Sequence, residues 1–137
     1  MRRAAIARAL TAAAVVSLIG AAVASAAGDD IRIVHVRIRY SAFIPDAIDV
    51  RPGETVRFVV RNADPIDHEF LIGDEAVQQV HEEGTEPHHG ARPGEISVPA
   101  GETVATTYTF GERGSTLFGC HLPGHYAYGM RGTIAIA

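Results

Sequence analysis

The most informative part of this sequence is the stretch Phe118-Gly119-Cys120-His121-Leu122-Pro123-Gly124-His125-Tyr126-Ala127-Tyr128-Gly129-Met130. It holds the chain's one cysteine, two of its histidines and the one methionine besides Met1. Cys120 and His125 lie five positions apart, as do His125 and Met130, and the turn residues between them can fold the three side chains around one point. Copper typically takes two His and one Cys in a plane, with a weak axial Met. The stretch therefore predicts a copper-type site completed by another imidazole.

A structural explanation exists for each of these residues taken alone. A single cysteine is more often a small buried hydrophobe than a ligand, and a single methionine usually fills the core. The combination of thiol, imidazole and thioether in one turn-rich loop favours metal binding, because transition-metal ligand sets are diagnostic only together.

The first part of the chain differs from the rest. Three arginines within the first eight residues precede an Ala/Val/Leu run, and Ala24-Ser25-Ala26 then offers the small residues that a signal peptidase reads. We predict a signal peptide over residues 1–26 and one domain over residues 27–137, with no stable membrane insertion after cleavage. The alternative is a retained N-terminal anchor, since the apolar run approaches the length that spans a bilayer.

An exported protein with a single cysteine is unusual unless that cysteine, here Cys120, has a role such as metal binding. A single cysteine cannot form an internal disulfide, and an unpaired thiol in an oxidising compartment needs an explanation, which metal ligation supplies. Removing the predicted signal removes three of the twelve basic residues and none of the sixteen acids. The mature protein is thus acidic and contains no lysine, so we expect no nucleic-acid partner, and we expect a monomer.

The pattern from Ile31 onward is that of β-strands. Val34, Val36, Ile38 and Tyr40 alternate with polar residues, which is the period of a strand with one buried face. His35 belongs to the polar set and is expected to face solvent. Further short apolar runs, separated by Gly and Pro turns, predict an all-β, antiparallel sandwich; they are residues 47–50, 55–60, 70–72, 96–98, 104–110, 117–118 and 132–137.

His68 follows the turn-forming residues 62–67 and stands at the start of an apolar strand. A sandwich often presents site residues at such a junction between loop and rigid frame. An exposed loop histidine would be the default interpretation if the cluster at residues 118–130 were absent.

Residues 74–94 form a predicted insertion in the sandwich. The segment from Asp74 to Glu83 predicts a short helix, with Asp74 as N-cap, Gly84 as stop and an apolar side made by Ala76, Val77 and Val80.

His81, His88 and His89 lie in this insertion among glutamates. They could form a second, weaker site for Cu(II) or Zn(II), because imidazole and carboxylate suit those ions. A solvated acidic loop without a ligand is the alternative, since most charge runs are of that kind.

The upstream histidine followed by Cys-x4-His-x4-Met before the last strand resembles the cupredoxins, the blue copper proteins that include plastocyanins and azurins. The resemblance covers about Ile31 to Ala137 and implies a Greek-key β-sandwich with one type 1 copper ion. Carried over residue by residue, it implies His68, Cys120 and His125 as equatorial ligands and Met130 as the axial ligand. Two features depart from the family: Glu69 follows the first histidine, where Asn is frequent, and the acidic, His-bearing insertion is absent from a minimal plastocyanin.

The expected function is that of an exported one-electron carrier, periplasmic or extracellular, that meets an exported redox partner. The alternatives are a copper-binding protein for tolerance or delivery, which would meet a copper-handling protein, and a purely adhesive domain. An enzyme is not expected, because the chain lacks the His-x-His pairs of multicopper oxidases and the two cysteines of a dinuclear copper centre. We expect His125 to be the ligand nearest the surface, within an apolar rim formed by Leu122, Pro123, Tyr126 and Ala127.

Overall fold

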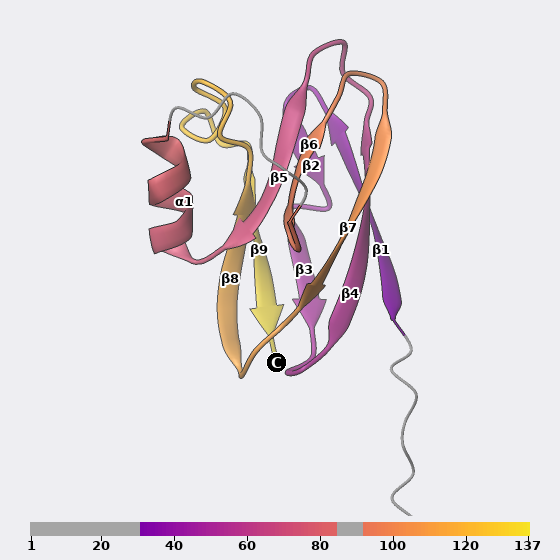
Figure 1. Ribbon diagram of the computed structural model, residues 1–137, viewed down its shortest axis with the longest axis vertical. Coiled ribbons are helices and arrows are strands. Elements are labelled where there is room, and N and C mark those ends of the chain that lie inside the picture. The colour runs from indigo at the N-terminus through magenta and orange to yellow at the C-terminus, as the bar shows by residue number, and fades with distance from the viewer. Residues whose placement is uncertain (1–30, 85–91) are drawn as a thin grey trace, which may run out of the picture.

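The predicted sandwich is confirmed by a computed structural model, which describes residues 31–84 and 92–137. Two β-sheets pack face to face, and the copper-type loop and the start of β5 lie at the same end of the sandwich (Figure 1). The described elements are β1 Arg32–Arg39, β2 Ala42–Ile44, β3 Ala47–Val50, β4 Thr55–Asn62, β5 His68–Gly73, α1 Glu75–Glu82, β6 Glu95–Val98, β7 Thr103–Thr109, β8 Gly114–Gly119 and β9 Arg131–Ile136.

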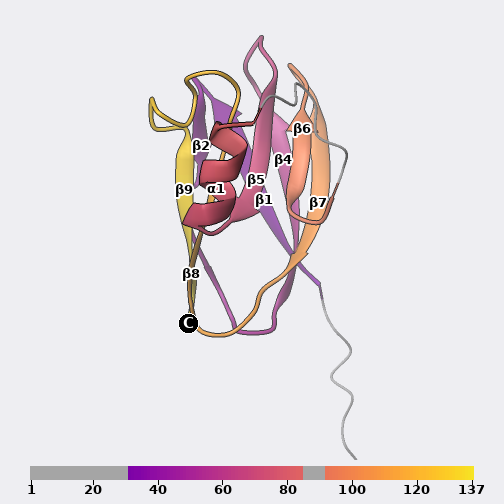
Figure 2. The same ribbon diagram turned by 60° about the vertical axis from the view of Figure 1, so that its left-hand side comes forward.

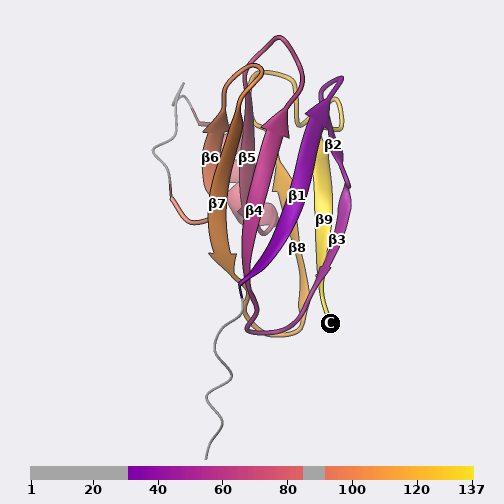
Figure 3. The same cartoon turned by 90° about the vertical axis from the view of Figure 1, so that its right-hand side faces the viewer.

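One sheet has the strand order β2-β1-β4-β7 (Figure 3) and the other has the order β3-β9-β8-β5-β6. Most neighbours are antiparallel, as expected, but β1 and β4 are parallel, and so are β3 and β9. Parallel pairs arise here because the chain leaves one sheet and crosses to the other before it returns beside the earlier strand. The predicted signal peptide lies outside the described residues. Within them, no helix is long and apolar enough to cross a membrane.

The core lies between the sheets and contains a cluster of phenylalanine rings. Phe70 on β5 packs against Phe43, Phe58 and Phe118, with ring centroids 5.8, 5.4 and 5.3 Å apart. Phe43 and Phe58 belong to the four-stranded sheet, whereas Phe70 and Phe118 belong to the other. The cluster therefore joins the sheets and anchors β5 and β8, the two strands that lead to His68 and Cys120.

The alternation predicted for the first strand ends one residue early. Val36 and Ile38 are buried and His35 is exposed, as predicted, but Tyr40 is 80% exposed. Tyr40 and Ser41 both adopt positive φ angles, 55° and 52°, which turn the chain out of β1 into β2. The prediction that Tyr40 shares the buried face was wrong because a left-handed turn interrupts the strand period.

The predicted helix is present as α1, and the side chain of its N-cap Asp74 accepts a hydrogen bond from Val77 N. It packs against β5 and β8 (Figure 2), but its buried residue is the polar Gln78. The apolar side made by Ala76, Val77 and Val80 faces solvent. The helix is thus fastened by hydrogen bonds, with Gln78 Nε2 donating to the carbonyl oxygens of Leu71 and Gly73.

Candidate metal centre

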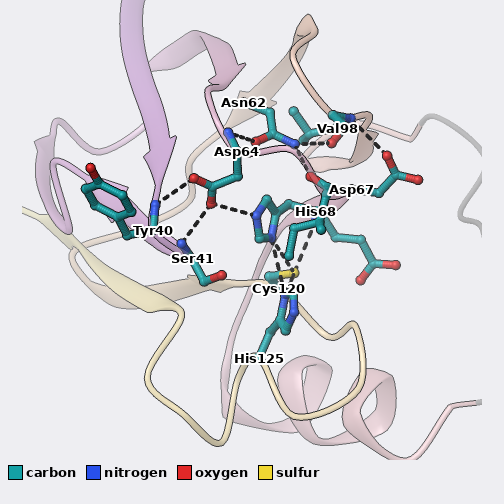
Figure 4. A network of polar contacts seen from close by, with 12 residues as sticks. Tyr40, Ser41, Asn62, Asp64, Asp67, His68, Val98, Cys120 and His125 are labelled. Atoms are coloured by element: carbon teal, nitrogen blue, oxygen red, sulfur yellow. Dashed lines mark hydrogen bonds and ion pairs between the residues drawn. The ribbon is translucent and has the colours of Figure 1, made fainter.

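Three of the predicted ligands converge at one end of the sandwich. The distance from Cys120 Sγ to His125 Nδ1 is 3.3 Å, and that from His68 Nδ1 to His125 Nδ1 is also 3.3 Å. Cys120 Sγ lies 4.0 Å from His68 Nδ1 (Figure 4). These ligand atoms all lie within 4.8 Å of one another, so a single ion can contact all three. Among residues 31–84 and 92–137, His68, Cys120 and His125 form the one group of three or more potential ligands whose ligand atoms lie this close together.

The site depends on pairing between strands that are distant in sequence. His68 opens β5, Cys120 directly follows β8, and the pairing of Leu71 with Gly119 brings these two strand ends together. The loop between Cys120 and Met130 is closed by backbone hydrogen bonds, from Cys120 N to Met130 O and from Met130 N to His125 O. Gly124 has a φ of 83°, a conformation that residues with a Cβ rarely adopt. The loop geometry thus returns His125 toward Cys120.

The four predicted ligands differ in exposure. His68, Cys120 and Met130 are buried, and His125 is half-buried. His125 is therefore the most exposed of them, as expected. In the predicted rim, Pro123 and Ala127 are exposed, whereas Leu122 and Tyr126 are half-buried. Met130 contributes its backbone to the loop closure, and its role as axial ligand stays a prediction.

Cys120 is a free, fully buried thiol. Burial raises its pKa to about 11, although the backbone amides of Leu122 and Glu69 act in the opposite direction. The negative charges of Glu69 and Glu82 raise it further. The apoprotein accordingly carries a neutral thiol at neutral pH, and a metal ion must displace its proton.

We expect copper binding to release the Cys120 proton. Because the thiol titrates near pH 11 and the metal binds the thiolate, apparent affinity should rise about tenfold per pH unit across the neutral range. Calorimetric titration of the apoprotein in buffers of different ionisation enthalpy measures the released proton. Cys120→Ser serves as the control and should release none from this position. A change in copper affinity of only about threefold or less between pH 7 and pH 8 would contradict the expectation.

His68 is neutral in these surroundings. Burial lowers the pKa of its imidazole, and the hydrogen bond to Asp64 only partly opposes that effect. Its Nε2 lies 3.0 Å from Asp64 Oδ2, while its Nδ1 faces Cys120 and His125. The two ring nitrogens thus have separate roles, one toward the protein and one toward the candidate metal position.

Glu69 on β5 makes hydrogen bonds with Cys120 and with the residue that follows it. Its backbone N lies 3.3 Å from Cys120 Sγ and donates to the sulfur. Its side-chain Oε2 accepts a hydrogen bond from His121 N at 3.2 Å. A buried glutamate thus binds the residue after the cysteine.

His121 connects the predicted insertion to the metal-binding loop. Its Nε2 lies 2.6 Å from Gln78 Oε1, and its Nδ1 lies 2.8 Å from Glu82 Oε2, so both nitrogens face acceptors on α1. Its ring stacks on Tyr126 with centroids 4.5 Å apart. The polar side of α1 therefore holds the loop that begins at Cys120.

The predicted second site is only partly visible. His81 Nδ1 lies 3.1 Å from Val77 O, its Nε2 lies 3.5 Å from Glu95 Oε1, and its ring is 6.0 Å from that of His121. His88 and His89 lie outside the described residues. A second site made by His81, His88 and His89 therefore stays a prediction.

Sequence reasoning did not single out Asp64, Gln78 or His121 and treated Glu69 only as a departure from the family. Asp64 was part of a turn, Gln78 was one polar helix residue among several, and His121 was overshadowed by the neighbouring ligand candidates. Their contacts join residues 4 to 52 positions apart. The one local signal is the spacing of four between Asp64 and His68.

The comparison with protein families identifies the chain. The family described as copper binding proteins, plastocyanin/azurin family, matches residues 33–137. The chain belongs to this family. Copper-resistant cuproprotein CopI of Rubrivivax gelatinosus is 38% identical over 97 residues, which cover 69% of this chain and 59% of that protein. The protein of the same name from Pseudomonas aeruginosa is 28% identical over 137 residues, covering 77% of this chain and 76% of that protein.

Among solved structures, a dithionite-reduced auracyanin from Roseiflexus castenholzii matches with a TM-score of 0.67 and 22% identity. The match covers 77% of this chain and 96% of that chain and supports the fold. The chemistry of the site agrees with the family, because two imidazole nitrogens and one thiol within 4.8 Å form the equatorial set that copper takes. This member of the plastocyanin/azurin family is a copper-binding protein.

Proposed function

We propose that this protein is an exported copper-binding protein of copper tolerance, which holds one type 1 copper ion through His68, Cys120, His125 and Met130. Two relatives, one of them 38% identical over 97 residues, carry the name copper-resistant cuproprotein, and this observation favours tolerance. The convergence of His68, Cys120 and His125 supports the ligand assignment. In this role the protein acts as a monomer in the periplasm or outside the cell and binds copper without an enzymatic step.

A copper ion held by these residues could supply one-electron chemistry, because thiolate, imidazole and thioether donors suit both of its oxidation states. The buried thiol and the neutral His68 imidazole supply fixed donors directly after β8 and at the start of β5. The half-buried His125 leaves one ligand close to solvent. These residues can therefore retain an ion without exposing the thiol.

One-electron transfer is the second candidate, and the exposure of His125 favours it because electrons could pass through that ligand to a docked partner. A carrier would exchange electrons rapidly with an exported redox protein, with a dependence on ionic strength set by the acidic surface. A tolerance protein would instead exchange metal with a copper-handling partner. Both need the same ligands, so growth in copper and electron exchange with a partner must be measured to separate them.

Deleting the gene tests the proposal. We expect the deletion strain to grow normally without added copper and to be inhibited at copper concentrations that the parent tolerates. The wild-type gene should restore tolerance, Cys120→Ser should fail to restore it, and the surface variant His35→Ala should restore it fully. Unchanged tolerance after deletion, together with fast electron exchange with an exported partner, would reject copper tolerance in favour of the carrier.

The axial position gives a second check on the type 1 assignment. Met130→Leu is expected to retain the colour of the Cu(II) protein and to raise its reduction potential, because a donor to the oxidised metal is lost. Voltammetry of the purified variant measures the shift. A potential equal to that of the wild type would indicate that Met130 only fills the core, and loss of all copper binding would show that its role is misassigned.

A further inference from the structure

The imidazole of His68 stands between a carboxylate and the candidate metal position. Asp64 Oδ2 lies 3.0 Å from Nε2, on the side of the ring away from Cys120 and His125 (Figure 4). Nδ1, on the other side, lies 3.3 Å from His125 Nδ1 and 4.0 Å from Cys120 Sγ. Only Nδ1 can therefore reach an ion held by the three residues, and Nε2 is committed to Asp64.

Asp64 is a buried carboxylate surrounded by donors. It is only 8% exposed, and it accepts hydrogen bonds from Tyr40 N at 2.7 Å and Ser41 N at 2.8 Å. Burial alone would raise its pKa, but the bonds from Ser41, Tyr40 and His68 outweigh that effect and lower it. Both carboxylate oxygens accept from backbone N–H groups, Oδ1 from Tyr40 and Oδ2 from Ser41, so Asp64 is the acceptor in its contact with His68. The proton shared with His68 then resides on Nε2, which leaves the lone pair on Nδ1.

The position of the carboxylate is fixed from both sides. Asp64 N donates to Asn62 Oδ1 at 2.9 Å, and Asn62 Nδ2 donates to the carbonyl oxygens of Ile66 and Val98. On the other side, Tyr40 and Ser41 direct two successive backbone N–H groups at it from left-handed conformations. Successive N–H groups in such a turn form an anion-binding nest, and residues with a Cβ keep this conformation only where the surroundings hold them in it. The turn that ends β1 therefore holds the Asp64 carboxylate in place through two backbone hydrogen bonds.

We propose that Asp64 is a positioning residue of the copper centre: it holds His68 as the Nε2–H tautomer, with Nδ1 free for the metal, and it favours Cu(II) over Cu(I). This inference rests on the proposed copper ligation by His68. The first effect follows from the hydrogen bond. The second follows because a carboxylate bonded to a ligand imidazole makes it a stronger donor, which stabilises the more highly charged ion. The strain at Tyr40 and Ser41 is then part of the metal centre.

Asp64→Asn tests the electrostatic part while preserving shape. An amide oxygen in the place of Oδ2 can still accept from both Ser41 N and His68 Nε2, so the tautomer is retained. The charge is removed, and the amide NH2 in the place of Oδ1 no longer accepts the hydrogen bond from Tyr40 N. We expect the Cu(II) affinity to fall about 10- to 100-fold, with a smaller fall in the Cu(I) affinity. Each tenfold change in the ratio of the two affinities raises the reduction potential by about 59 mV. Competition with chromophoric chelators and voltammetry measure both quantities.

Asp67→Asn is the matched control. Asp67 is a nearby acid whose Oδ1 accepts from Ala100 N at 2.9 Å and which makes no hydrogen bond to His68. Its removal should leave the ratio of affinities within about threefold of wild type, because an exposed charge is screened. If Asp64→Asn, folded, changes the ratio no more than Asp67→Asn does, the electrostatic role is rejected.

The tautomer is read directly from the ¹⁵N shifts of His68 in the metal-free protein. We expect the proton on Nε2 in the wild type and in Asp64→Asn, and a mixture of tautomers in Asp64→Ala. A wild-type proton on Nδ1 would overturn the positioning role. This readout needs no copper, so it separates failure of the inference from failure of the proposed function, which would appear as a colourless Cu(II) protein. If Asp64→Ala does not fold, the wild-type shifts and Asp64→Asn still decide the question.

Discussion

Replacing Cys120 with serine is expected to abolish the strong colour of the Cu(II) protein and to lower its copper affinity more than about 100-fold. In the proposed type 1 site the colour would arise from charge transfer between thiolate and copper, and the chain contains no other cysteine. Loss of a direct ligand should exceed the 10- to 100-fold cost that is typical when only a supporting residue is lost. The visible absorption spectrum of the copper-loaded protein measures the first effect, and competition with a chelator measures the second.

The fold should survive this change. Cys120 forms no disulfide, and the serine hydroxyl could accept the hydrogen bond that Glu69 N now donates to sulfur. Circular dichroism of Cys120→Ser should thus match that of the wild type. The exposed His35 supplies the control, since His35→Ala removes an imidazole on β1 that is not part of the ligand cluster and should preserve the colour. A colourless wild-type protein, or an intense colour retained by Cys120→Ser, would contradict the assignment of the thiolate.

Truncation of Phe70 should produce the largest loss of stability. Phe70 is fully buried and contacts three other rings, so Phe70→Ala is expected to lower the free energy of unfolding by about 3–5 kcal/mol. That is a large share of the roughly 5–15 kcal/mol that stabilises a domain. Urea denaturation of the metal-free protein measures the change. The same variant should bind copper more weakly, because β5 carries His68 two residues away.

Tyr128→Ala is the control for this experiment. Tyr128 is 93% exposed, so its truncation should change the free energy of unfolding by no more than about 0.5 kcal/mol. A loss below about 1 kcal/mol in Phe70→Ala would be inconsistent with a ring packed between the two sheets.

The strand faces, the helix with its N-cap and the spacing of the loop ligands could all be predicted from the sequence alone. The period of two in β4 places Val56, Phe58 and Val60 on one buried face, and Asp74 followed by a helical run predicted α1 with its N-cap. The spacing of Cys120, His125 and Met130 within one Pro/Gly-rich loop predicted a copper-type ligand set. These features can be recognised in sequence because each arises from residues within a few positions of one another.

Only the tertiary structure decided which distant residues complete and support the site. His68 and His125 are 57 positions apart and meet because β5 pairs with β8. Pairing of strands also places Glu69 beside the residue that follows Cys120, and the helix places Gln78 against it. Hydrogen-bonded partners of this kind follow no period in the sequence, because their geometry depends on how the elements pack. For the same reason a turn at Tyr40, which interrupts a regular strand pattern, could be connected with Asp64 only in the folded chain.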